Sequence, residues 1–164
     1  MNKTIAICPG SFDPITKGHL DIISRSAKMF DKVIVVVMSN VYKTSSTFTI
    51  EERIDMIKKS VAGIQNVEVD SFDGLLADYA AIKKAGVIIK GLRAMSDFEY
   101  EFQMALANKK LNPELETVFL TTSAENMYLS SSIVKQIASM GGDVSDFVPE
   151  AIYSYIVEKL TDKI

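Results

Sequence analysis

The chain has 164 residues, 48% of them hydrophobic, and this length and apolar content predict one folded domain over residues 1–164. Its formal net charge of −3 argues against a protein that binds nucleic acid or an anionic membrane, because both partners favour a basic surface. One cysteine and one histidine exclude a disulfide framework and a Cys/His zinc cluster, and without a signal-peptide pattern or a membrane-length apolar stretch we expect a cytoplasmic protein.

Short β-branched runs alternate with longer amphipathic patterns along the chain. The runs predict five strands, at residues 4–8, 32–38, 66–71, 86–89 and 116–121. The amphipathic patterns predict helices at residues 18–29, 49–61, 75–84 and 96–111, and then a C-terminal helical segment at 131–140 and 149–160. This alternation is typical of the α/β class, with a doubly wound, five-stranded parallel sheet and flanking helices.

Two of the predicted helices start with the spacing of a capping box. In this motif a hydroxyl and a carboxylate three residues apart each accept a hydrogen bond from the other residue's backbone N–H. Thr49 with Glu52 and Ser96 with Glu99 both match it. We therefore expect Thr49 and Ser96 to cap their helices.

The turn between the first strand and the first helix is a candidate phosphate site. Residues 9–19 read Pro-Gly-Ser-Phe-Asp-Pro-Ile-Thr-Lys-Gly-His and end at the only histidine, His19. Such a turn exposes unpaired N–H groups and the positive end of the helix dipole, and it lies where open sheets bind ligands. The His19 imidazole could donate to a phosphoryl oxygen, and the alternative is a solvated or capping side chain.

Three later segments add cations or hydroxyls after strands. Lys43 follows the second strand and could instead be simply solvated, while residues 90–93 (Lys-Gly-Leu-Arg) follow the fourth. Residues 130–132 are three serines at a helix start, with Lys135 about one turn further on. Capping explains one of these hydroxyls, and a triphosphate would explain the others. Neither a Gly-x-Gly-x-x-Gly loop after the first strand nor a Walker loop is present, so the phosphate loop is of another kind.

Two motifs at opposite ends of the chain resemble those of the nucleotidyltransferase superfamily. Residues 16–19 (Thr-Lys-Gly-His) are similar to its Thr/His-x-Gly-His motif, and residues 130–135 are similar to its Ile-Ser-Ser-x-x-x-Arg/Lys motif. Four intervening segments resemble the bacterial phosphopantetheine adenylyltransferases in particular, at residues 48–53, 90–93, 97–101 and 113–116.

That resemblance implies a Rossmann-like fold, a homohexamer and a place in coenzyme A synthesis. The expected reaction joins ATP to 4′-phosphopantetheine and gives dephospho-coenzyme A and pyrophosphate. The expected mechanism is a direct in-line attack without a covalent enzyme intermediate. Mg²⁺ is expected as the cofactor, carried by the phosphates of ATP and not by a protein metal site, and coenzyme A is expected as a possible feedback ligand.

The resemblance also implies roles for particular residues. The expected catalytic residues are His19, Lys43 and Arg93. The expected ATP-binding residues are Ser11, Phe12, His19, Lys90, Gly91, Arg93, Glu101, Ser130, Ser131 and Ser132. The expected phosphopantetheine-binding residues are Ser11, Lys43, Leu75, Leu76 and Lys90.

The chain departs from the family pattern at three positions. Cys8 stands where an aromatic residue is common, Lys90 where arginine is usual, and Ser11 where threonine is frequent. Lysine keeps the positive charge of arginine but loses its planar two-point grip, so its contact with ATP is expected to be weaker or differently placed.

Two other functions remain as alternatives. A sibling nucleotidyltransferase acting on nicotinamide mononucleotide or a phospho-alcohol is one, although nicotinamide enzymes of this superfamily generally have a histidine where this chain has Thr16. A nucleotide-binding protein without catalysis is the other. The joint presence of His19, Lys43, Arg93 and the three serines disfavours it, because a binder needs no clamp for an acceptor phosphate.

Overall fold

The sheet of the predicted fold is present in the computed structural model, which describes residues 4–39 and 46–161. Five parallel strands lie in the order β3-β2-β1-β4-β5. Their bounds are β1 Ile5–Gly10, β2 Lys32–Met38, β3 Val67–Phe72, β4 Val87–Leu92 and β5 Glu116–Thr121. The chain builds outward from β1 to β3 and then returns to add β4 and β5 on the other side, which confirms a doubly wound, Rossmann-like sheet.

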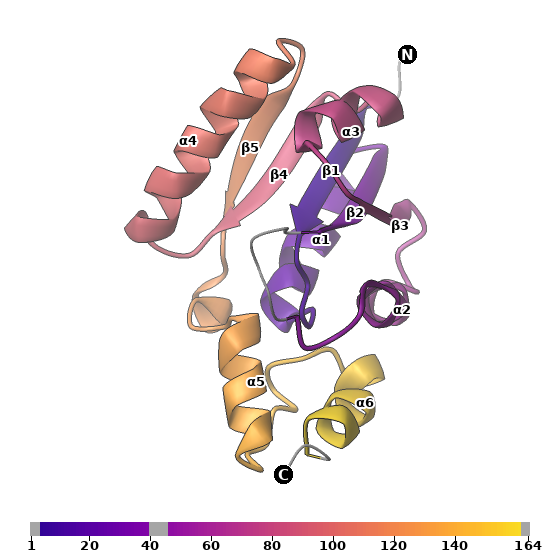
Figure 1. The fold of residues 1–164 in the computed structure, drawn as a ribbon, viewed down its shortest axis with the longest axis vertical. Coiled ribbons are helices and arrows are strands. Elements are labelled where there is room, and N and C mark those ends of the chain that lie inside the picture. Colours follow the sequence, from indigo (N-terminus) through magenta and orange to yellow (C-terminus); the bar gives the residue numbers. More distant parts are fainter. Residues whose placement is uncertain (1–3, 40–45, 162–164) are drawn as a thin grey trace.

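All six predicted helices are present. They are α1 Lys17–Met29, α2 Ile50–Ser60, α3 Leu76–Lys83, α4 Met95–Leu111, α5 Ser131–Ser139 and α6 Glu150–Thr161. A short 3-10 helix that the sequence did not indicate, η1 (Ala124–Asn126), precedes α5. Figure 1 shows α4 along β5 at one edge of the sheet, and α5 and α6 together beyond its end.

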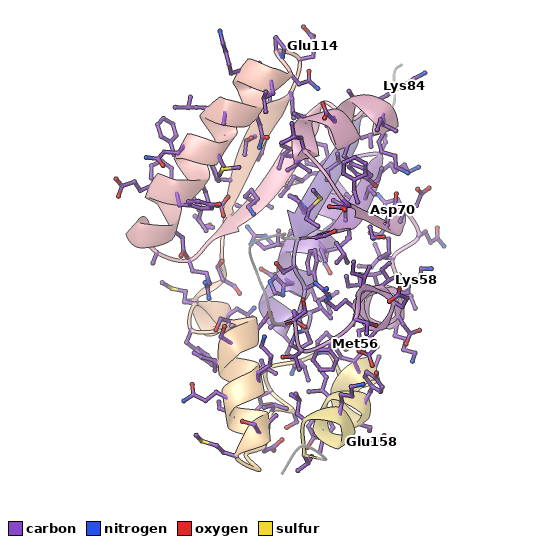
Figure 2. All side chains as sticks on the ribbon, in the orientation of Figure 1. Met56, Lys58, Asp70, Lys84, Glu114 and Glu158 are labelled. Atoms are coloured by element: carbon purple, nitrogen blue, oxygen red, sulfur yellow. The ribbon has the colours of Figure 1, made fainter. Side chains whose placement is uncertain are left out.

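The core has two layers because the central strands are buried on both faces. Val33, Val35 and Val37 belong to the cluster that contains residues of α1, α2, α5 and α6. Ile34 and Val36 point the other way and join the residues of α3. In Figure 2, Met56 of α2 points into the interior while Lys58 of the same helix points outward. The uninterrupted apolar run of β2 therefore reflects burial on both faces of a parallel strand.

β1 and β4 separate toward their carboxyl ends. β1 pairs with β2 from Ile5 to Gly10, but it pairs with β4 only at Ala6 and Ile7. The prediction that the first strand ends at residue 8 was therefore too short, since β1 continues beside β2. The prediction for the fourth strand was also too short, and Lys90 lies on β4 instead of after it. The separation falls where the strand order reverses, which is the position at which such sheets bind ligands.

One predicted capping box is confirmed and the other is wrong. At α2, Glu52 N donates to Thr49 Oγ1 at 3.2 Å, and Thr49 N donates to Glu52 Oε2 at 2.8 Å. At α4, the N-cap is Ala94, whose methyl group makes no capping hydrogen bond. Because β4 continues to Leu92, the connection is short and the helix has already begun before Ser96.

The second oxygen of Glu52 ties α6 to α2. Glu52 Oε1 accepts from Lys159 Nζ at 2.6 Å and from Tyr155 Oη at 2.7 Å. The bond from Lys159, then those from Tyr155 and Thr49, lower the pKa of Glu52 to about 2. A carboxylate whose pKa is depressed by folding stabilises the protein above its unfolded pKa, near 4.5, and loses that contribution as the pH falls toward 2.

Glu52→Gln is therefore expected to lower the free energy of unfolding at pH 7 by about 2 kcal/mol, because the charged hydrogen bonds are lost. The difference from wild type should shrink as the pH falls below 4.5. Urea unfolding at pH 7, 4 and 3 measures it, with the exposed neighbour Glu51→Gln as the control. A difference that is the same at all three pH values would contradict the assigned titration.

Candidate functional site

A cavity of about 840 Å³ lies at the carboxyl ends of β1 and β4. Its lining includes residues of β1, the β1–α1 loop, α1, α2, β4, α4 and α5. All ten residues expected to bind ATP line it: Ser11, Phe12, His19, Lys90, Gly91, Arg93, Glu101, Ser130, Ser131 and Ser132. The sequence therefore identified residues that are far apart in the chain and that the fold brings to one cavity.

Two residues expected at the acceptor site, Leu75 and Leu76, are not among its lining. Lys43 lies outside the residues that the structure describes. Leu75 is the N-cap of α3 and is 55% exposed, and Leu76 packs on the core beneath that helix. Leu75 nevertheless follows the carboxyl end of β3, so both leucines lie at the same edge of the parallel sheet as the cavity.

The imidazole of His19 is oriented by a capping box. His19 N donates to Thr16 Oγ1 at 3.3 Å, and Thr16 N donates to His19 Nδ1 at 3.0 Å. Thr-x-x-His has the spacing of the motif, with histidine in the place usually taken by glutamate or glutamine. A backbone N–H can only donate, so Nδ1 must be an acceptor and the proton of the neutral ring must reside on Nε2.

The ring is also held in its neutral form. Burial, followed by the charges of Arg93 and Lys90, lowers the pKa of His19 to about 4. A pKa below the usual 6.5 leaves the ring uncharged throughout the neutral range. His19 is thus a neutral donor that presents Nε2–H, and it needs no protonation to form a hydrogen bond to an anion.

The single histidine allows this assignment to be tested by NMR without ambiguity. We expect the ¹⁵N spectrum at pH 7 to show the neutral tautomer with the proton on Nε2. We also expect no titration of the ring between pH 8 and pH 5, since its pKa is about 4. A midpoint near 6.5, or a proton on Nδ1, would contradict the capping geometry.

Phe12 forms a wall of the histidine site. Its ring meets the His19 ring edge-on, with centroids 5.1 Å apart, and only 5% of the residue is exposed. Its backbone has a positive φ of 47°, which is uncommon for a bulky residue and is typical of constrained sites. A Cβ at Gly10 would lie 3.0 Å from the Phe12 ring, so a larger residue there would push the ring from its place by a few tenths of an ångström.

The two cationic side chains of residues 90–93, Lys90 and Arg93, are each paired with a carboxylate from α4. Lys90 Nζ lies 3.4 Å from Glu101 Oε1, and Arg93 Nε lies 3.5 Å from Asp97 Oδ2. Arg93 NH1 also donates to the carbonyl of Leu129 at 2.6 Å. Arg93 therefore ties the end of β4 to the residue that precedes the three serines.

The three serines have different roles in the structure. Ser130 is the N-cap of α5, and its Oγ accepts from Ile133 N at 3.1 Å. The Ser131 hydroxyl donates to the carbonyl of Pro14 at 2.7 Å. Capping thus accounts for one hydroxyl, as expected, and a tie to the β1–α1 loop accounts for a second. Ser132 and the N-terminus of α5 remain as donors toward the cavity.

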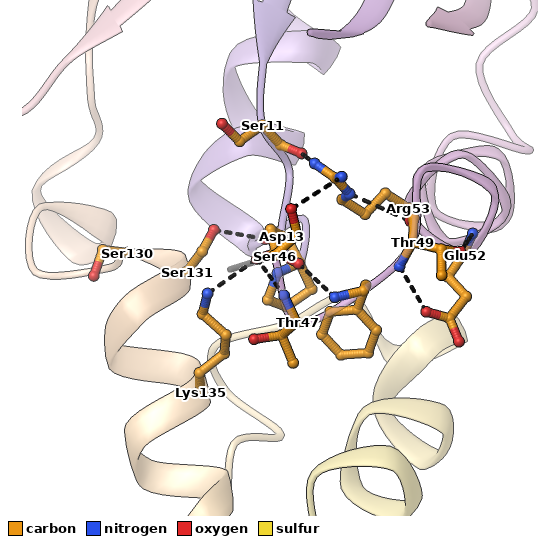
Figure 3. Close-up of polar contacts among 12 residues, drawn as sticks. Ser11, Asp13, Ser46, Thr47, Thr49, Glu52, Arg53, Ser130, Ser131 and Lys135 are labelled. Atoms are coloured by element: carbon orange, nitrogen blue, oxygen red, sulfur yellow. Dashed lines mark hydrogen bonds and ion pairs between the residues drawn. The ribbon is translucent and has the colours of Figure 1, made fainter. Parts of the chain in front are cut away.

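Sequence reasoning missed the residues that hold the β1–α1 loop itself (Figure 3). Asp13, which is 8% exposed, accepts hydrogen bonds from the backbone N–H groups of Thr47 and Phe48 and pairs with Lys135. Arg53, which is 6% exposed, donates to the carbonyl of Ser11 at 2.9 Å. The sequence did contain one signal, because Arg53 is a charged residue inside an apolar helical pattern. A buried charge needs a partner, so this position could have been recognised as part of a polar contact.

The donors around the cavity suit phosphate groups. They are cations, hydroxyls, a neutral imidazole N–H and the N-terminus of α5. Within residues 4–39 and 46–161, no cluster of three or more histidine, cysteine, aspartate or glutamate side chains is placed to hold a metal ion. The same residues contain no helix with the length and apolar character needed to cross a membrane.

The chain is similar to proteins of known family. Residues 7–137 match the cytidylyltransferase-like family model. The chain is 58% identical to the phosphopantetheine adenylyltransferase of Caldanaerobacter subterraneus subsp. tengcongensis, over 94% of this chain and 96% of that one. It is 54% identical to the phosphopantetheine adenylyltransferase of Finegoldia magna, over 99% of this chain and 100% of that one.

A solved structure supports the fold at much lower identity. The bifunctional NMN adenylyltransferase/ADP ribose pyrophosphatase of Francisella tularensis matches with a TM-score of 0.70 and 19% identity. The match covers 95% of this chain and 48% of that one. The fold likeness and the high identity over nearly the whole chain agree, and the chain belongs to the phosphopantetheine adenylyltransferase family of cytidylyltransferase-like proteins.

Proposed function

We propose that this chain transfers the adenylyl group of ATP to 4′-phosphopantetheine, giving dephospho-coenzyme A and pyrophosphate. Identities of 53% and 58% to phosphopantetheine adenylyltransferases, over nearly the full length, support this reaction. The observation that carries it is the convergence of His19, Lys90, Arg93 and the start of α5 on one cavity. The reaction belongs to coenzyme A synthesis and takes place in the cytoplasm.

The chemistry needs no nucleophile from the protein. An oxygen of the acceptor's phosphate, already an anion, forms a bond to the α-phosphorus of ATP. The bond from that phosphorus to the bridging oxygen breaks, and pyrophosphate leaves with the electron pair. Holding both reactants in line can supply about 7 to 11 kcal/mol, and one well-aimed donor about 3 to 4 kcal/mol.

His19 is the donor to the α-phosphate in this proposal. Its Nε2–H is neutral, so it can stabilise the growing charge on the phosphoryl oxygens and keep its own proton. Ser11 and the backbone of Phe12 hold oxygens in the β1–α1 loop, close to His19. A donor fixed before the substrates arrive need not reorganise during the reaction, which makes it more effective.

The remaining roles divide between the two substrates. Lys90, Gly91, Arg93 and Glu101 contact ATP, and Ser130 to Ser132 bind its β- and γ-phosphates at the N-terminus of α5. Lys43 and Arg93 grip the acceptor's phosphate, Ser11 and Lys90 also contact the acceptor, and Leu75 and Leu76 meet its pantetheine arm. Magnesium enters as part of the MgATP substrate, bridging phosphate oxygens. Coenzyme A contains the same pantetheine and adenylyl parts, so it would compete for this site.

The test is pyrophosphate release from MgATP with 4′-phosphopantetheine, with nicotinamide mononucleotide, or with no acceptor. Release with phosphopantetheine alone is the expected result. Release with nicotinamide mononucleotide alone would overturn the proposed acceptor. If the folded protein binds ATP but releases no pyrophosphate with either acceptor, the chain is a nucleotide-binding protein without this catalytic activity.

The proposed assembly is a homohexamer. In support, α4 exposes large apolar side chains along its length, including Tyr100, Phe102, Met104 and Leu106, each at least 41% exposed in the single chain. Such a surface is unusual on a soluble monomer and is typical of a subunit contact. Sedimentation equilibrium tests it: a six-chain mass is expected, and a monomer at micromolar concentration would contradict it.

A further inference from the structure

We propose that the ion pair between Asp13 and Lys135 is a positioning element that sets the distance between the two halves of the ATP site. One half is the β1–α1 loop with the first turn of α1, which carries His19, and the other is the N-terminus of α5 with the three serines. The inference rests on the proposed function, because it assigns these halves to the α-phosphate and to the β- and γ-phosphates.

Asp13 is a junction of three segments (Figure 3). Its Oδ1 accepts from Phe48 N at 2.9 Å, and its Oδ2 accepts from Thr47 N at 3.0 Å. Lys135 Nζ reaches the same Oδ2 at 3.1 Å. The Asp13 side chain is only 11% exposed, so these three donors take the place of water around its oxygens. The carboxylate therefore joins the β1–α1 loop to the segment before α2 and to α5.

The contact with α5 is made at two points. Ser131 and Lys135 are four residues apart and share one face of α5. Ser131 Oγ donates to the carbonyl of Pro14, while Lys135 reaches Asp13, the preceding residue of the loop. Two bonds one helical turn apart fix both the distance and the rotation of α5 relative to the loop. The rotation decides where the serines and the helix N–H groups point.

The same geometry separates two roles for Lys135. A lysine one turn after the serines could itself bind phosphate, but here its ammonium group is held by a carboxylate that also has two backbone donors. In a positioning role Lys135 acts only through Asp13. In a phosphate-binding role its effect would not depend on Asp13. A double-mutant cycle distinguishes the two.

The experiment compares wild type, Lys135→Met, Lys135→Arg, Asp13→Asn and the Asp13→Asn/Lys135→Met double variant, with saturating 4′-phosphopantetheine and varied MgATP. Lys135→Met is expected to lower kcat by about 10- to 100-fold with less than about a threefold change in the KM for ATP, because the reactants are misplaced but still bound. Lys135→Arg keeps the charge and should recover most of kcat. The kcat of the double variant should lie within about twofold of the kcat of Asp13→Asn alone.

Lys83→Met is the matched control, because Lys83 pairs with Asp70 at 2.8 Å on α3 and β3 without lining the cavity. Its kcat should equal that of wild type. The inference would be overturned if Lys135→Met lowered kcat by the same factor in wild type and in Asp13→Asn. It would also be overturned if Lys135→Met raised the KM for ATP and left kcat unchanged. If Asp13→Asn does not fold, the split between kcat and KM in the two Lys135 variants decides alone. Absence of turnover in wild type would instead contradict the proposed function.

Discussion

Replacing His19 with alanine is expected to lower kcat by about 100- to 1,000-fold, which is the usual effect of removing one preorganised donor to a developing charge. The KM for ATP should change far less, because the contact is strongest in the transition state. Steady-state kinetics of pyrophosphate release and a separate ATP-binding titration measure the two effects. The prediction is specific to a donor that is neutral in the free enzyme, so the ratio of the wild-type kcat/KM to that of His19→Ala should stay constant through pH 6.5.

Two further variants separate the chemistry of His19 from its part in the capping box. Asparagine places an acceptor near the position of Nδ1, so His19→Asn keeps the bond from Thr16 N but has no distal donor. Glutamine can place an N–H near the position of Nε2. We expect His19→Asn to be as slow as His19→Ala and His19→Gln to recover part of the rate. If His19→Ala stays within about threefold of wild type, the assigned role is wrong.

Arg93→Ala is expected to lower kcat/KM by about 100- to 1,000-fold for both substrates, because two functions are lost together. The variant removes a cation from the cavity and breaks the bond to the Leu129 carbonyl that holds the segment before α5. Arg93→Lys keeps the charge, but a single ammonium group cannot replace the planar fork. Its kcat/KM should therefore fall between those of wild type and Arg93→Ala. Varying each substrate in turn measures both constants.

Arg25 offers a closely matched control. It pairs with Asp21 at 3.1 Å and donates to the carbonyl of Thr121 at 2.8 Å, so it makes the same two kinds of contact as Arg93 but does not line the cavity. Arg25→Ala should leave both kinetic constants near those of wild type. Equal losses in the two variants would show that the effect at Arg93 is general destabilisation.

Strands and helices could be predicted because their signals are local. The apolar run of β2 and the Thr49–Glu52 cap are each complete within a few residues of sequence. Boundaries went wrong where a neighbouring element decides them. β1 continues through Gly10 because β2 stays beside it, and α4 starts before Ser96 because β4 leaves a short connection. No local pattern contains that information.

Many of the residues that line the cavity could also be predicted from local signals in the sequence. Strand ends and helix starts carry the residues that line it, and parallel strands bring those ends to one edge. Asp13 and Arg53 were missed because their partners depend on the tertiary fold, and the tie from Asp13 to Lys135 joins residues 122 positions apart. The Thr16–His19 box was present in the sequence at the right spacing, but with an unusual acceptor.

The separation of β1 and β4 makes the opening of the cavity a property of the main chain. β1 stays paired with β2 through Gly10, while its pairing with β4 ends at Ile7, so the space begins where main-chain pairing stops. Substrate preference can therefore drift over evolutionary time by exchange of side chains on a constant scaffold. The Francisella tularensis protein shares this fold at only 19% identity.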